Sequence, residues 1–193
     1  MSQETSSGTT TGDFVKMTVA GITLDPTNNM PIIILKDVEN KVAIPIWIGL
    51  VEASAIATEI EGVELARPMT HDLLKSVLET LGGKLDHIVV SDLRDNTFYA
   101  LLFIERGDEM LKIDSRPSDA IALALRTRSD LFVAQKVIDN SQQLDAEALK
   151  SILKKGETAE GTEEAAADDE KSKDRWAEIL ENLKPEDFGK YKM

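Results

Sequence analysis

The sequence contains no cysteine, so neither disulfide bridges nor thiolate metal ligands are available to it. Aromatic residues make up only 5% of the chain, and a core must therefore be built mainly from aliphatic side chains. The hydrophobic content of 42% is sufficient for such a core. No hydrophobic run reaches the roughly 20 residues that span a bilayer. We therefore expect one domain with tails, in a reducing compartment such as the cytoplasm, and no membrane partner.

Positive charge is also scarce, because 35 acidic residues outweigh 22 basic ones and give a net charge of −13. Proteins that bind nucleic acid usually present a basic face to the phosphates. This chain would need a local basic surface, or divalent metal ions that bridge its carboxylates to phosphate. The overall charge therefore argues against a nuclease.

The two ends differ in composition from the middle of the chain. Residues 1–13 are polar and lack the basic and apolar regions of a signal peptide, so we expect a disordered tail. Residues 156–172 are rich in Glu, Ala, Thr and Gly and predict an acidic flexible linker. Residues 173–193 predict a short amphipathic helix that docks on its own domain, a neighbouring subunit or another protein. The remaining domain spans residues 14–155.

Within this domain the patterns predict an α+β fold, with a largely antiparallel or mixed sheet and three to four packed helices. Alternating or β-branched runs predict strands at 14–24, 30–35, 42–47, 85–90, 97–105, 110–114 and 131–134. Helical spacing of apolar residues predicts helices at 48–61, 71–81, 116–126 and 144–153. Residues 135–140 are expected to be turn or coil. Pro45 indicates that its strand lies at an edge or ends in a bulge.

The most informative stretch is Asp114-Ser115-Arg116-Pro117-Ser118-Asp119, where a strand passes into a helix. We expect Ser115 to cap the helix, with the proline in the first turn. Arg116 is unusual, because a cation at a helix N-terminus opposes the helix dipole. It therefore needs a carboxylate partner or an anion. One interpretation is a capped turn with an internal Arg–Asp bridge. The other is an anion or metal site formed by Asp114, Ser115, Arg116, Ser118 and Asp119.

Further candidate residues lie elsewhere in the chain. His71 follows Thr70, the expected N-cap of its helix, and is either a surface or interface histidine or a general base or metal ligand. Asp92 and Asp95 flank a hairpin, where they either hydrogen-bond their own turn or approach Asp114. Such a carboxylate cluster would suit magnesium or manganese. Glu52 is expected to be a first-turn acid favoured by the helix dipole.

Several ordered blocks resemble the bifunctional nuclease family over roughly residues 15–153. The blocks are His71-Asp72-Leu73-Leu74 before Leu81-Gly82-Gly83, then Asp92 to Ala100, then Asp114 to Ala124. The resemblance implies the fold, and it implies hydrolysis of RNA and DNA. In a metal-assisted mechanism we expect Asp114 and Asp119 as metal ligands and Arg116 as phosphate clamp, with Ser115 and Ser118 beside it. His71 is the expected base, and Asp92 and Asp95 are weaker ligand candidates.

Two other functions remain open. The acidic balance and the lack of a strong catalytic triad favour a non-catalytic homo-oligomeric module. An exposed apolar helix face and the β-rich N-terminal meander indicate a homo-oligomer, most simply a dimer. The same motif could also bind a small anion without hydrolysing it.

Overall fold

The computed structural model describes residues 13–25, 28–63 and 65–144. The expected acidic linker, the C-terminal helix and nearly all of the N-terminal tail lie outside these residues. The described chain contains seven strands: β1 (Phe14–Leu24), β2 (Pro31–Asp37), β3 (Ala43–Trp47), β4 (Lys84–Arg94), β5 (Thr97–Arg106), β6 (Glu109–Ser115) and β7 (Asp130–Ala134). It also contains four helices: α1 (Leu50–Ile60), α2 (Thr70–Thr80), α3 (Pro117–Thr127) and α4 (Gln135–Leu144).

All seven strands form one sheet in the order β3-β2-β1-β7-β4-β5-β6. Two antiparallel meanders, β1–β3 and β4–β6, are joined by β7, which pairs antiparallel with β1 and parallel with β4. The fold is therefore α+β with a mixed, mostly antiparallel sheet, as the alternating patterns predict. Pro45 lies in β3, an edge strand, where its missing N–H removes no bond from a neighbouring strand.

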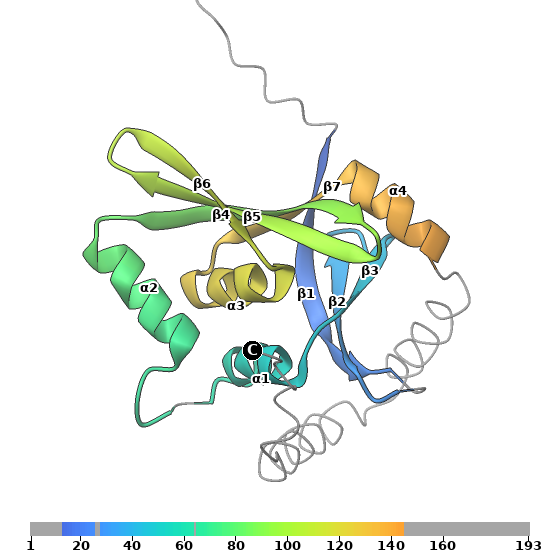
Figure 1. Cartoon of the computed structure of the whole chain (residues 1–193), viewed down its shortest axis with the longest axis horizontal. Helices are drawn as coiled ribbons and strands as arrows, with labels where there is room; N and C mark the ends of the chain where they lie inside the picture. The colour runs from blue at the N-terminus through green and yellow to red at the C-terminus, as the bar shows by residue number, and fades with distance from the viewer. Residues whose placement is uncertain (1–12, 26–27, 64, 145–193) are drawn as a thin grey trace, which may run out of the picture.

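The helices lie on different sides of the sheet (Figure 1). The helix α3 packs between α1 and α2 and contacts β4, β5 and β7, whereas α4 contacts β4, β7 and β3. In a flat sheet β3 and β4, four strand spacings apart, would be separated by about 19 Å. The helix α4 has ten residues, is therefore about 15 Å long, and contacts both of these strands. Ile33, Ile88 and Ile121 are among the fully buried core residues.

The prediction for residues 135–140 is wrong. Residues 135–140, expected to be turn or coil, belong to α4, because Val137 and Ile138 are buried against the body of the protein. Only two apolar residues occur in this polar stretch, too few to show a helical period. The expected helix at 144–153 falls almost entirely outside the described residues.

Both expected helix caps are displaced by one residue. Ser115 is the last residue of β6, and Arg116 occupies the N-cap position of α3 with extended backbone angles and no side-chain cap bond. Pro117 begins the helix as predicted. Met69, not Thr70, occupies the N-cap position of α2, and the Asp72 carboxylate accepts a hydrogen bond from its backbone N–H at 2.8 Å.

Candidate functional site

Arg116 links α3 to α1 at the N-terminus of α3. Its Nε and Nη2 donate to the two carboxylate oxygens of Asp119, one turn later, at 2.7 and 3.1 Å. Its Nη1 donates to Glu52 of α1 at 2.6 Å. The cation opposes the helix dipole, but two carboxylates compensate it. The predicted internal Arg–Asp bridge is therefore present, with Glu52 as a partner from a distant part of the sequence.

Asp119 also contacts His71, which lies in the first turn of α2. The Nε2 atom of His71 lies 3.2 Å from Oδ1 of Asp119. Burial raises the pKa of Asp119, but hydrogen bonds from Arg116 and His71, with their charges, lower it by more, so the net pKa is below its ordinary value. An ionised carboxylate only accepts hydrogen bonds, so Nε2 carries the proton in this contact. In a neutral ring Nδ1 is then the nitrogen that can take up a proton.

His71 and Arg116 differ strongly in solvent exposure. The His71 side chain is only 13% exposed, although the sequence suggested an exposed helix end. Arg116 is 61% exposed, and the Asp119 and Glu52 carboxylates raise its pKa above its already high ordinary value, so it is permanently charged. Within the described part of the chain three of its five N–H groups are engaged, which leaves two to donate to an anion.

The absence of a side chain at Gly49 allows the Glu52 carboxylate to reach this cluster. Gly49 is the N-cap residue of α1, and a Cβ built at this position would collide with the Glu52 carboxylate. A glycine here therefore leaves room for the carboxylate to reach Arg116. From the sequence alone, Glu52 was expected only to be a first-turn acid.

A second charged cluster lies farther along α2 and α3. Arg126 is 5% exposed, and its Nε donates to Asp72 at 2.5 Å, with Glu59 of α1 at 3.9 Å. Lys75 donates to the Arg126 carbonyl at 3.0 Å. The backbone N–H of Met69 and then Arg126 lower the pKa of Asp72. The sequence pattern alone did not indicate a role for Arg126.

The other predicted residues are not brought to Arg116. Asp114 alternates with Ile113, whose partner on β5 is the buried Leu102, so Asp114 faces away from that side of the sheet. Ser115 donates to the Arg116 carbonyl at 3.0 Å, and Ser118 is buried. A substrate role for Ser118 would need that burial to be relieved.

The expected cluster of Asp92, Asp95 and Asp114 does not form. Asp92 lies 3.1 Å from both Lys136 of α4 and Arg94. The Lys136 hydrogen bond, the Leu93 N–H and both cations lower its pKa, although burial raises it. Asp95 and Asn96 have φ of 49° and 57°, which suits the tight turn between β4 and β5. Asp114 is two strand spacings, about 10 Å, from β4.

We next consider whether the residues around Arg116 could bind a metal ion. Among residues 13–25, 28–63 and 65–144, no three His, Asp or Glu side chains are grouped so that they could hold one. The oxygens of Glu52 and Asp119 that would serve as ligands instead accept hydrogen bonds from Arg116. The residues at this centre therefore do not fit a metal in the arrangement described.

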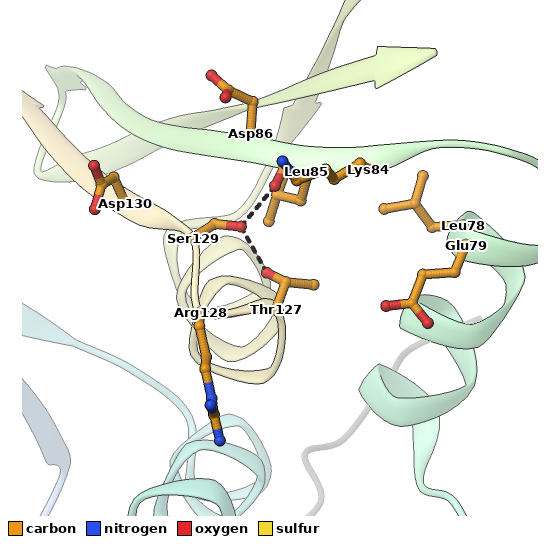
Figure 2. A pocket seen from close by; sticks show the side chains of 9 residues that line it. All are labelled: Leu78, Glu79, Lys84, Leu85, Asp86, Thr127, Arg128, Ser129 and Asp130. Atoms are coloured by element: carbon orange, nitrogen blue, oxygen red, sulfur yellow. Dashed lines mark hydrogen bonds between the residues drawn. The ribbon is translucent and has the colours of Figure 1, made fainter. Parts of the chain in front are cut away.

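Two hollows lie away from Arg116. The larger, about 510 Å³, lies between the end of α2, the start of β4 and the end of α3. Figure 2 shows Ser129 in its wall, hydrogen-bonded to Thr127 and to the Leu85 carbonyl. The smaller, about 260 Å³, lies beside Asp72 and Arg126. Neither is lined by Arg116, Asp119 or His71.

The structure is an α+β domain. Its central cluster combines an arginine, two carboxylates and a histidine, which are residue types used for anion binding and acid–base chemistry. The bifunctional nuclease domain matches residues 33–145, so the chain belongs to the bifunctional nuclease domain family. An uncharacterized protein of Mycobacterium tuberculosis is 36% identical over 170 residues, which cover 88% of this chain and 95% of that protein.

Plant relatives are more distant. Bifunctional nuclease 1 of Oryza sativa subsp. japonica is 20% identical over 101 residues, which cover 51% of this chain and 30% of that protein. The bifunctional nuclease of Oryza minuta matches to the same extent. In the described part of the chain, the helices fall short of the length and apolar character needed to cross a membrane.

Proposed function

We propose that this protein hydrolyses phosphodiester bonds of RNA and DNA at the centre formed by Arg116, Asp119 and His71. Membership of the family supports the substrate class. The observation that carries the proposal is the chain of contacts from an exposed, permanently charged arginine through Asp119 to a shielded histidine.

Each residue has a role in this proposal. The two remaining N–H groups of Arg116 bind phosphate oxygens and stabilise the charge that develops on them. Nδ1 of His71 accepts the proton of the attacking hydroxyl or water, while Asp119 holds the tautomer that leaves Nδ1 basic. The new phosphorus–oxygen bond forms as the bond to the leaving oxygen breaks; that oxygen takes a proton from solvent water, and His71 releases its proton to solvent. No step is assigned to a metal ion.

Glu52 and Asp119 oppose substrate binding, because they already compensate the charge of Arg116. A phosphate bound to the two remaining N–H groups of Arg116 would therefore be repelled by both carboxylates. Substrate affinity should accordingly be modest and should weaken with added salt.

The test compares Arg116→Ala with Arg106→Ala. Arg106 is a matched control, because its side chain is 56% exposed and it pairs with Glu109 in the hairpin at the opposite end of β6 from Arg116. Labelled single-stranded RNA and DNA are incubated with each purified protein, with magnesium, with manganese and with chelator. We expect Arg116→Ala to lose roughly 100-fold or more in cleavage rate, and Arg106→Ala to stay near the wild type.

Three outcomes have distinct meanings. Equal cleavage by the wild type and Arg116→Ala would overturn the assignment of the centre and point to a contaminating nuclease. No cleavage by folded wild type under all conditions would favour the non-catalytic module or the anion sensor. Cleavage that requires added metal would overturn the mechanism proposed here, which assigns no step to a metal ion.

A further inference from the structure

The helix α2 is oriented with its polar side toward the protein. His71, Asp72 and Lys75 contact α3 through Asp119, Arg126 and the Arg126 carbonyl. Of its aliphatic residues, Leu78 packs partly against the core, and no residue of α2 is buried. An amphipathic helix at the surface of a globular protein normally does the opposite and buries its apolar stripe.

The opposite side of α2 is apolar and exposed. We call it the α2 face, and define it by five residues that are 44–71% exposed: Met69, Leu73, Leu74, Val77 and Leu81. Leu73, Val77 and Leu81 recur every four residues and therefore lie along one line of the helix. None of the five carries charge, and the polar residues Ser76 and Thr80 lie beside them. Figure 1 shows α2 at the periphery, with α3 on its inner side.

We propose that the α2 face binds the α2 face of a second copy of this chain in a two-fold dimer. At about 100 Å² for each partly exposed aliphatic residue, the five residues offer about 500 Å² per protomer, near the upper end for an apolar patch on a monomer. Two such faces remove about 1,000 Å² from water, the lower bound of a specific interface. A two-fold axis needs only one self-complementary patch.

The charge distribution favours a second copy over other occupants. Copies with a net charge of −13 repel each other, and contact is least costly through a face without charge. A nucleic acid would require cations on the face, and a membrane surface would require lysines and arginines at its border. Lys75 is the single cation on α2, and it is engaged with α3.

Dimer formation would also stabilise α2 and the contacts that its polar side makes with α3. An eleven-residue helix with no buried residue gains little from its own packing, and two such helices packed together shield each other. His71 and Asp72 lie on this helix. The partner's α2 would therefore help to hold His71 on Asp119 and Asp72 on Arg126, whether or not the centre is catalytic.

The test uses the full chain and the variants Leu73→Glu and Val38→Glu. Val38 is a matched control, because it is an exposed aliphatic residue, 69% exposed, in the turn between β2 and β3. Molar mass is measured by sedimentation across a range of concentrations, with circular dichroism to check folding. We expect a dimer for the wild type and Val38→Glu, and at least 10-fold weaker association for Leu73→Glu.

Amide hydrogen exchange locates the contact independently of charge. Exchange in α2 of the wild type should slow as concentration rises, and exchange in Leu73→Glu should not. A wild type that stays monomeric would overturn the proposal, and would suggest that residues 173–193 cover the α2 face. A dimer that Leu73→Glu leaves intact, or that Val38→Glu weakens equally, would also overturn it.

Discussion

The pair formed by Asp72 and Arg126 offers a sensitive test of what holds α2 to the protein. The change Asp72→Asn keeps the size of the side chain and removes its charge. Arg126, which is 5% exposed, would then keep its contact with the Ala122 carbonyl at 3.0 Å and the more distant Glu59 at 3.9 Å. A buried guanidinium would lose its nearest anionic partner.

The size of the effect follows from burial. Removing one partner of a fully buried ion pair costs about 3–5 kcal/mol, because the other charge remains buried without compensation. Asp72 is about one third exposed, and Glu59 stays near, so solvent and the second carboxylate reduce the cost. We expect the free energy of unfolding to fall by about 2 kcal/mol, which corresponds to a decrease in Tm of about 4–8 °C.

The effect should depend on pH in a defined direction. The N–H of Met69 and then Arg126 lower the pKa of Asp72 in the folded state. A carboxyl with a lowered folded pKa stabilises the protein above its unfolded pKa, about 3.9, and this contribution is lost as pH falls through the folded value. The difference in free energy of unfolding between the wild type and Asp72→Asn should therefore have its full size at pH 7 and should shrink below about pH 4.

Urea unfolding followed by far-ultraviolet circular dichroism at pH 7 and pH 3 measures both effects. Asp95→Asn is the control, since Asp95 lies in a turn with positive φ that asparagine also adopts. A difference below about 0.5 kcal/mol at pH 7 would refute the assignment of Arg126 as a buried charge that depends on Asp72. A difference of the same size at pH 3 would show that packing, not charge, is responsible.

Two further predictions concern stability. Asp119→Asn should destabilise the protein by about 1 kcal/mol at pH 7, because Arg116 and His71 lose a shared carboxylate that is partly screened by solvent. The lowered pKa of Asp119 means that this loss should also fade below about pH 4, as urea titrations would show. Gly83→Ala should cost about 1–3 kcal/mol, because its Cβ would lie 2.6 Å from the Leu78 side chain, and Tm measures this directly.

The sequence predicted the parts of the fold that depend on local periodicity. Alternation specified both meanders, and helical spacing specified α1, α2 and α3, because side chains repeat every second residue in a strand and about every 3.6 in a helix. Pro117 located the start of α3. The α4 helix was missed, since the burial of Val137 and Ile138 stabilises a stretch with little helical pattern.

The candidate site was predicted only in part. Arg116 and Asp119 are three residues apart on one helix, so their bridge could be inferred from spacing. Glu52 and His71 are 64 and 48 residues away from their partners, and no local pattern predicts such pairs. The supposed grouping of Asp92 with Asp114 did not form, because β5 lies between their strands.

By itself, then, the sequence determined the strands and the helices α1 to α3, the family signature and the presence of an arginine that needs anionic partners. Tertiary structure decided which partners it has. It placed β7 between the two meanders and brought α1 and α2 against α3. It also turned the polar side of α2 inward, because the buried guanidinium of Arg126 needed an anionic partner that its own helix did not supply.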